Sequence, residues 1–171
     1  FMNTDESVSV TALAQSHRAG TRILAQSSNS NYQIRQATSL QDIQAAQTLR
    51  FFVFNLEMQE GLENSYHTMR DEDPFDAICQ HLLVECNGEV VGTYRMQTGT
   101  DASANLGFYS GQEFDLSPFA PQNAQILELG RACVHKDHRN LHVLSLLWKG
   151  IATYARQTGC RYPVSYTHLT L

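Results

Sequence analysis

Apolar and polar positions divide the chain into an unpatterned beginning and a strongly patterned remainder. Residues 1–31 are rich in Ser, Thr, Ala, Gln and Asn and show little periodicity, which is typical of a flexible arm. Residues 32–162 carry the alternation and the helical spacing of one folded domain. We therefore divide the chain into an N-terminal arm, a domain over 32–162, and a short tail over 163–171.

Strands and helices within the domain follow from these spacings. Ser39 is a suitable N-cap for a helix over residues 40–54, and Asn87-Gly88 is a strong hairpin signal. A second helix is expected over residues 140–156, ended by Gly159. Its inward face is expected to hold Leu141, Leu144, Leu147, Trp148 and Ile151. Alternation predicts strands over residues 32–37, 81–86, 89–97 and 126–134, with a last strand beginning near Arg161.

Two connecting segments differ in character. Residues 57–72 are polar and irregular, which predicts a mobile loop. Residues 98–125 form a longer insertion that contains the aromatic residues Phe108, Tyr109 and Phe114. Aromatic side chains are rare in linkers, so this insertion is expected to be an ordered flap.

The most informative stretch is residues 126–148, which read as a strand, a polar turn and a helix. The first N–H groups of such a helix have no partner within it and can bind an anion. Residues 131–161 hold six basic residues against the single acid Asp137, although the chain has a net charge of −5. This asymmetry suggests an anionic ligand or an acidic partner, and the alternative is a solvated helix face with chance clustering.

Composition narrows the class of protein. At 171 residues and 42% hydrophobic content, the chain can form one ordinary core, and it has neither an apolar run of transmembrane length nor a signal-peptide pattern. The cysteines show no Cys-x-x-Cys pairing, so we expect them to be reduced and the protein to be cytoplasmic. These four are Cys79, Cys86, Cys133 and Cys160.

The sequence gives little support for a nucleotide site, a Ser-His-Asp triad, a nucleic-acid site or a metal site. No phosphate-binding or dinucleotide fingerprint and no Ser-His-Asp pattern occurs, and the acidic chain lacks a basic-aromatic motif for nucleic acid. His135, His138 and His142 are spaced by three and four residues, but no carboxylate or cysteine completes a ligand set. We expect no metal and no nucleic acid partner.

Charged residues set into apolar surroundings are the better candidates for chemistry. Arg50 follows a helical pattern beside three phenylalanines, where it is either a stem packed on apolar surface or a paired charge. In the segment 73–76, Asp-Pro-Phe-Asp, the aspartates are either solvated caps or carboxylates held near the interior. A β-bulge at Gly130 would bring Glu128 and Arg131 to one face. The full set is Arg50, Asp73, Asp76, Arg95, Glu128 and Arg131.

If these six residues gather, three cations meet three anions at the ends of strands. A buried network of this kind is weak evidence for stability, and a site for a zwitterionic substrate is the more natural explanation. An arginine would clamp a carboxylate at two points, and Glu128 would hold an ammonium group and accept its proton. Taken singly, each residue has a structural ion pair as its alternative.

The order of several motifs resembles the ornithine N-acyltransferase group of the GNAT-fold acyltransferases, hemolysin-like acyltransferases related to acyl-homoserine-lactone synthases. The resemblance covers residues 32–162. The matching runs are Asp-Pro-Phe-Asp with Cys-x-His-Leu-Leu-Val, Val-Val-Gly-Thr-Tyr-Arg, Gly-Phe-Tyr-Ser with Glu-Phe-Asp-Leu, Leu-Glu-Leu-Gly-Arg-x-Cys-Val-His, Arg139-Asn140 and residues 146–152. Beyond Tyr162 the chain departs from the family pattern, since Pro163 would interrupt a central strand. We expect this tail not to be native and the natural domain to be truncated here.

The family implies an α/β (α+β) fold with a mixed sheet, flanking helices and a bulged central strand that splays from its neighbour. The thioester donor lies in that splay, with its phosphopantetheine phosphate at the N-terminus of the next helix. The residues that this implies are Cys133, Val134, Arg139, Asn140, His142 and Val143. His142 and Leu144 occupy positions where GNAT loops that bind CoA have small residues. We therefore expect a donor on acyl carrier protein, which is acidic, and no permanently bound cofactor.

The activity implied is transfer of a long acyl chain, with or without a 3-hydroxyl group, to the α-amine of ornithine, giving lyso-ornithine lipid. Glu128 and Arg131 would be catalytic, and Arg50, Asp73, Asp76 and Arg95 would bind the acceptor. Peripheral association with the inner face of the membrane is a further expectation. The alternatives are a signal-lactone synthase, a CoA-dependent acetyltransferase of the same fold, and a non-catalytic module that binds lipid or carrier.

Overall fold

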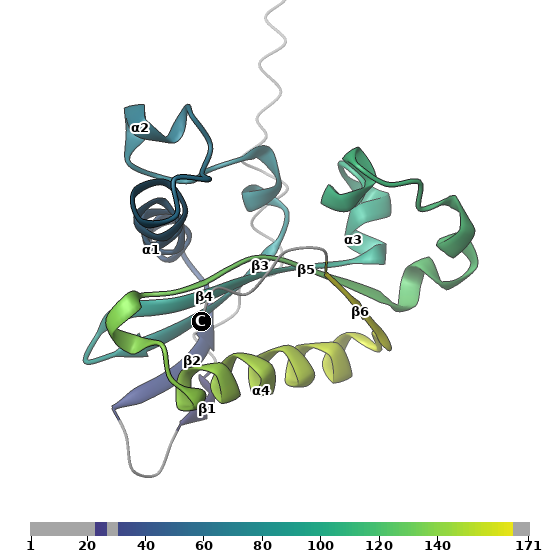
Figure 1. The fold of residues 1–171 in the computed structure, drawn as a ribbon. Coiled ribbons are helices and arrows are strands. Elements are labelled where there is room, and N and C mark those ends of the chain that lie inside the picture. Colours follow the sequence, from purple (N-terminus) through teal and green to yellow (C-terminus); the bar gives the residue numbers. More distant parts are fainter. Residues whose placement is uncertain (1–22, 27–30, 166–171) are drawn as a thin grey trace, which may run out of the picture.

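A mixed six-stranded sheet forms the centre of the described chain (Figure 1). The computed structural model describes residues 23–26 and 31–165. Neighbouring strands are antiparallel from β1 to β5, and β5 and β6 are parallel. In spatial order, which is also chain order, the strands are β1 (Ile23–Gln26), β2 (Tyr32–Gln36), β3 (Gln80–Cys86), β4 (Glu89–Thr98), β5 (Ile126–Val134) and β6 (Tyr162–Val164).

The expected strands from residue 32 onward are confirmed, and β1 is a correction. Ile23–Gln26 lies within the stretch predicted to be a flexible arm, and it pairs with β2 as an antiparallel edge strand. This segment is too short and too weakly alternating for its sequence to predict a strand. It becomes a strand because it pairs with β2. The other residues of that arm, 1–22 and 27–30, lie outside the described residues, as does the tail from 166.

Two long helices cover opposite faces of the sheet (Figure 1). Helix α1 (Leu40–Arg50) contacts β4 and β5 and continues directly into a wider π-helix, η2 (Phe51–Glu57). Helix α4 (Leu141–Thr158) packs on the other face. The shorter helices are α2 (Ser65–Thr68), η3 (Pro74–Ala77), α3 (Gly99–Ala104), η4 (Tyr109–Gln112), η5 (Ser117–Gln125) and η6 (Lys136–His138).

Helix α4 begins and ends where the sequence predicts, but with a different inward face. Asn140 caps its N-terminus, and Gly159 ends it with a φ of 73°. Leu141 and Trp148, expected inside, are 83% and 49% exposed. The face that carries Gly150 packs on the sheet instead: a Cβ at Gly150 would lie 2.6 Å from Cδ1 of Ile34, so the absence of a side chain permits this close approach. The buried residues of α4 are Val143, Leu146, Leu147, Gly150, Ile151 and Tyr154.

Strand β5 contains the predicted bulge. Thr93 lies opposite Cys133 and Arg95 opposite Gly130, so β5 holds one more residue than β4 over the same span. Arg131, at the extra position, has a φ of 50°, in the left-handed region that an arginine seldom adopts. The bulge turns Glu128 and Arg131 to the same face of the sheet.

The other side of β5 is only partly paired. Strand β6 pairs with residues 126–128 of β5, and among the described residues no strand continues this pairing past Glu128. β6 ends at Val164, the residue opposite Glu128, and Figure 1 shows this short strand beside β5. Pro163 is accommodated because β6 is the edge strand of the described sheet. No helix in the described part of the chain is long and apolar enough to cross a membrane.

Candidate active site

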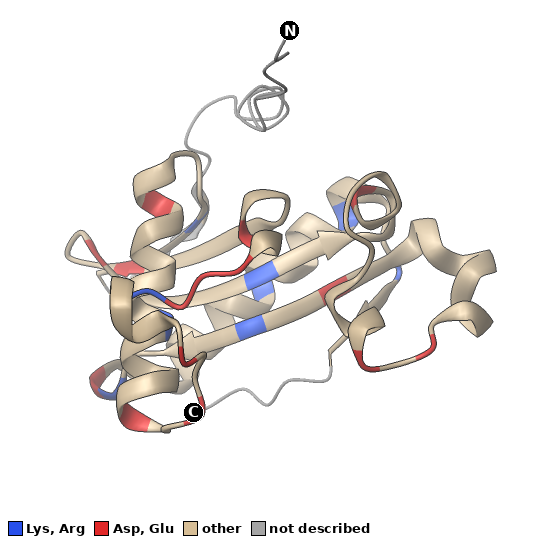
Figure 2. Cartoon of the chain, turned by 90° about the horizontal axis from the view of Figure 1, so that it is seen from above, with Lys and Arg blue, Asp and Glu red and all other residues tan. Residues whose placement is uncertain are grey.

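Six charged side chains form one continuous line of ion pairs on the α1 face of the sheet. Their charges alternate in the order Arg131, Asp71, Arg50, Asp76, Arg95 and Asp73. Figure 2 shows basic positions of the central strands next to acidic positions of the chain that crosses this face. Five of these residues were predicted from the sequence, and the line as a whole is electrically neutral.

Arg50 lies at the centre of this line and is completely buried. Its Nε donates to Oδ1 of Asp71 at 2.9 Å, and its Nη2 donates to Oδ2 of Asp76 at 2.6 Å and to the main-chain oxygen of Asp71. It is therefore a paired charge rather than a stem packed on apolar surface. It sits at the last position of α1, where the helix widens into η2, an irregularity common at functional sites.

The Asp-Pro-Phe-Asp segment fulfils both of the predicted roles. Asp73 caps η3 by accepting from the N–H of Phe75 at 2.8 Å, and Pro74 occupies the first helical position. Asp76 is 3% exposed and points inward. Nη1 of Arg95 donates to Oδ1 of Asp73 at 2.7 Å and to Oδ1 of Asp76 at 2.9 Å. The turn therefore caps η3 and also places two carboxylates against Arg95 of β4.

Asp71 completes the line and corrects the prediction of a mobile loop over residues 57–72. Its side chain is 1% exposed and accepts hydrogen bonds from Arg50 and Arg131, one of them from Nε of Arg131 at 3.0 Å. The N–H of Asp71 also donates to the main-chain oxygen of Gln47, which ties this segment to α1. The sequence did not identify Asp71, because an aspartate at the end of a polar, irregular segment resembles a solvated loop residue.

Glu128 stands apart from the line of ion pairs. Its Oε2 accepts from the N–H of Tyr109 and its Oε1 from the N–H of Ser110, both at 2.8 Å. Glu128 is 6% exposed. Because Asp71 takes the third anionic position of the line, the Glu128 charge has no arginine partner there. The predicted flap is ordered as α3, η4 and η5, and it docks on the sheet through this carboxylate.

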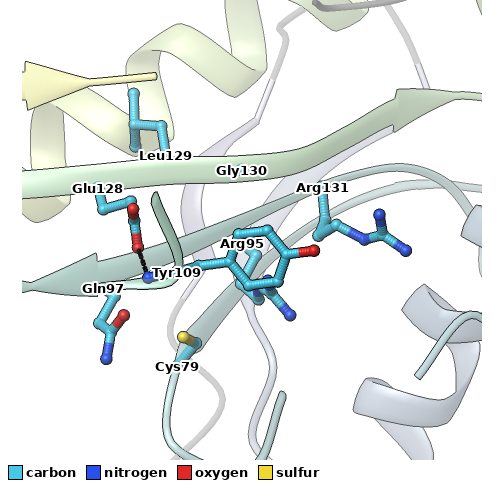
Figure 3. Close-up of a pocket in the computed structure, with 8 residues that line it drawn as sticks. All are labelled: Cys79, Arg95, Gln97, Tyr109, Glu128, Leu129, Gly130 and Arg131. Carbon is cyan, nitrogen blue, oxygen red and sulfur yellow. Dashed lines mark hydrogen bonds between the residues drawn. The ribbon is translucent and has the colours of Figure 1, made fainter. Parts of the chain in front are cut away.

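A cavity of about 170 Å³ opens between β4, β5 and η4 (Figure 3). The Tyr109 ring lies over the Arg95 guanidinium, 5.1 Å from its centroid to Cζ. The cavity is smaller than the ~300–1,000 Å³ of drug-sized sites, so it suits a small polar molecule rather than an acyl chain. Its lining residues are Cys79, Arg95, Gln97, Tyr109, Glu128, Leu129, Gly130 and Arg131.

Burial and charge set the protonation states around this cavity. Burial raises the pKa of Asp76, but the charges of Arg50 and Arg95 outweigh burial and hold it below its usual range. Burial lowers the pKa of His81 to about 4, so its imidazole is neutral at pH 7. Burial also raises the pKa of the thiols of Cys79 and Cys133 to about 12. Both cysteines remain protonated and are poor nucleophiles.

The residues expected near the donor gather where β5 ends and α4 begins. Cys133 packs with Leu49 and Val53 on the α1 side, and the side chains of Val134 and Val143 lie in the core with α4. Arg139 makes a two-point ion pair with Glu57, with both distances 2.6 Å.

The N-terminus of α4 is already capped by its own sequence. Oδ1 of Asn140 accepts from the N–H groups of His142 and Val143, each at 3.0 Å. A more open cavity of about 330 Å³ lies beside this end of β5. It is lined by Phe52, Val53, Leu56, Glu57, His135 and Lys136.

Comparison with known proteins places this arrangement in a family. A family model described as an acetyltransferase (GNAT) domain matches residues 49–149, which include the end of α1, the predicted site and the first half of α4. The chain belongs to the GNAT family. The mixed sheet, the bulged β5 and the helix that follows it are therefore the GNAT core of this protein.

Curated relatives narrow the similarity within GNAT proteins. The chain is 41% identical over 135 residues to an L-ornithine N(alpha)-acyltransferase of Brucella abortus, covering 73% of this chain and 48% of that protein. It is 38% identical over 133 residues to one of Rhodobacter capsulatus, covering 72% of this chain and 51% of that protein. The chain spans about half the length of the curated relatives it matches.

A solved structure supports the fold. The crystal structure of the AHL synthase LasI superimposes with a TM-score of 0.53 at 19% identity, covering 78% of this chain and 70% of that one. At this level of identity the similarity concerns the GNAT fold alone.

Proposed function

We propose that this protein is an N-acyltransferase that joins a long acyl chain to the α-amine of ornithine, giving a lyso-ornithine lipid. The observation that carries the proposal is the small cavity in which the Glu128 side chain lies beside a line of balanced ion pairs without being part of it. The name of the curated relatives, L-ornithine N(alpha)-acyltransferase, supports the same acceptor.

The acceptor fits the cavity by charge. Arg95 donates to Asp73 and Asp76 through Nη1, and among the described residues its Nε and Nη2 make no hydrogen bond. This edge of the guanidinium is suited to the carboxylate of an amino acid. Each oxygen of Glu128 accepts one backbone N–H and keeps a second acceptor direction for the ammonium group.

The reaction that this geometry supports is direct attack. Glu128, directly or through a water molecule, takes a proton from the α-ammonium group, and the free amine attacks the thioester carbonyl. The new C–N bond forms and the C–S bond breaks, so the acyl group moves to nitrogen and the departing thiolate is protonated. The protonated thiols of Cys79 and Cys133 favour this route over an acyl-cysteine intermediate.

The donor that we propose is a thioester on acyl carrier protein. Past Glu128, no strand of the described chain pairs with this side of β5, and we propose that an extended phosphopantetheine arm lies there. Asn140 already occupies two N–H groups of α4, and His142 and Leu144 leave little room for close backbone contact with a pyrophosphate. A donor with one phosphate suits this end better than CoA. Because the product is an amphiphile, we propose that it is released at the inner membrane face.

The test is an assay of purified protein with ornithine and either acyl carrier protein thioester or acyl-CoA, followed by mass spectrometry. The proposal predicts an acyl-ornithine amide, formed faster with the carrier-bound donor. No amide with any basic amino acid would refute the activity, and faster turnover with acyl-CoA would refute the donor. A lactone formed from S-adenosylmethionine would identify a lactone synthase instead.

A substitution of Glu128, the proposed base, distinguishes an enzyme from a non-catalytic binding module. Glu128→Gln should lower kcat by about 10²–10⁴-fold, the usual contribution of general acid–base catalysis. Glu113→Gln, at an exposed position of the flap, is the matched control and should keep the wild-type rate. A Glu128→Gln variant with the wild-type rate would exclude Glu128 as the base.

A further inference from the structure

Gln97 is a buried residue whose side-chain amide lines the cavity. It lies on β4, two residues after Arg95, and its side chain is 2% exposed. Both its Oε1 and its Nε2 are shielded from solvent and have no hydrogen-bond partner among the described residues. Figure 3 shows the amide at the end of the cavity that also holds Cys79, away from Arg131.

A buried amide without hydrogen-bond partners is unfavourable for folding, which suggests that Gln97 has another role. A buried polar group without a partner destabilises the folded state, and native structures contain few of them. An apolar side chain would fill the same space without this cost. The amide has an oxygen that accepts and an NH₂ group that donates, so it is matched by a molecule that carries a donor and an acceptor close together. The head group of an α-amino acid, with its ammonium and carboxylate groups on one carbon, has this pattern.

The position of Gln97 adds to this argument. It lies directly across from Glu128 in the β4–β5 register. Opposed residues on neighbouring antiparallel strands have Cβ atoms about 4.5–5.5 Å apart, so one amine can reach both side chains. A second carboxylate at this place would repel Glu128, whereas an amide supplies a carbonyl acceptor without a charge.

We propose that Gln97 binds the head group of the amino-acid acceptor and orients its nucleophilic amine. Glu128 removes one proton of the α-ammonium group, and Oε1 accepts one of the two remaining N–H bonds, which holds the free amine in place for its attack on the thioester. Nε2 donates to the α-carboxylate, on the side where Arg95 also reaches it. This role rests on the proposed N-acyltransferase function and assigns a further residue to its acceptor site.

The experiment compares Gln97→Met, which keeps the length of the side chain and removes both polar atoms, with wild type. Gln157→Met, at an exposed position of α4, is the matched control. Steady-state kinetics give KM for ornithine and for the acyl carrier thioester, and calorimetric titration gives Kd for ornithine without donor. Thermal melting reports on the fold.

Loss of one or two hydrogen bonds to charged groups predicts a fall in kcat/KM for ornithine of about 10–100-fold, with KM for the thioester unchanged. Kd for ornithine should rise by a similar factor. The melting temperature should stay the same or rise, because an unpaired buried amide has been removed. A structural role predicts the reverse: a lower melting temperature and equal effects on both substrates.

Three results distinguish this inference from the function on which it rests. A Gln97→Met variant with wild-type Kd and kcat/KM for ornithine would overturn the role of Gln97 while leaving the acyltransferase intact. Binding of ornithine that depends on Gln97, with no amide formed by the wild type, would uphold the head-group site and refute the acyltransferase. Wild-type protein that does not bind ornithine would refute both.

Discussion

At the scale of single residues, Asp71 holds together the two arginines that flank the site. It is the common partner of Arg50 and Arg131, and its side chain is 1% exposed. Removing one partner of a buried ion pair leaves a charge without compensation, which costs more than the pair itself contributes. The stability of this face therefore depends on a residue that no motif marks.

We predict that Asp71→Asn lowers the free energy of unfolding by about 3–5 kcal/mol, because two guanidinium groups lose their shared carboxylate. Urea denaturation followed by circular dichroism measures this change. Asp137→Asn is the control, since that side chain is 71% exposed and its pairing with His135 is expected to contribute little. A loss below about 0.5 kcal/mol for Asp71→Asn, typical of surface substitutions, would contradict the account.

The residues of this site that could be predicted are those with unusual neighbours in the sequence. Arg50 beside aromatic residues, Arg95 inside a hairpin and the Asp-Pro-Phe-Asp turn all stand out, and the structure gathers them. Asp71 and Gln97 do not stand out, because an aspartate in a polar loop and a glutamine near a strand end are common. Their importance depends on which atoms surround them after folding, and linear spacing does not contain that information.

At the scale of elements, two local irregularities build the site from an otherwise regular sheet. The bulge in β5 turns Arg131 to the face that Glu128 occupies, and Gly130 before it was the signal that predicted this. The widening of α1 into η2 was not predicted, since the apolar spacing continues without a break. The flap was expected to be ordered, but its docking uses main-chain N–H groups, which carry no side-chain signature.

We predict that the N–H of Tyr109 holds the flap on Glu128. Phe108 has φ −75° and ψ 144°, a conformation that a following proline accepts, so Tyr109→Pro removes this donor without distorting the turn. A hydrogen bond to a charged group contributes about 1.5–3 kcal/mol, so amides of residues 110–112 should exchange with solvent at least about tenfold faster.

Tyr109→Ala is the control for this experiment, because it loses the ring but keeps the N–H. Hydrogen–deuterium exchange followed by mass spectrometry compares the two variants. Equal exchange in Tyr109→Pro and Tyr109→Ala would show that the ring, rather than the hydrogen bond to Glu128, holds the flap.

At the scale of the whole molecule, buried titratable groups link stability to pH. Burial lowers the pKa of His81 from 6.5 to about 4, so between these values the unfolded chain binds a proton that the folded chain does not. The stability that neutral His81 provides is complete above about pH 6.5 and is lost as the pH falls toward 4. Asp76, whose pKa lies below its usual range, adds a loss only in stronger acid.

We predict that the free energy of unfolding falls by up to about 3 kcal/mol between pH 6.5 and 4. His81→Gln keeps a donor for the main-chain oxygen of Asp76 and cannot be protonated, so it should flatten this dependence. His67→Gln, at an exposed position, should retain the wild-type slope. Denaturation curves at a series of pH values measure the effect, and an unchanged slope in His81→Gln would rule out His81 as its source.

The proposed function requires that the cavity between β4, β5 and η4 receives the amino-acid acceptor beside Glu128. A crystal structure of the protein with bound ornithine tests it most directly. The account predicts the α-nitrogen within hydrogen-bond distance of the Glu128 carboxylate and the α-carboxylate against Arg95. Ornithine bound instead in the open cavity beside Leu56 and Lys136, with Glu128 and Gln97 untouched, would contradict it.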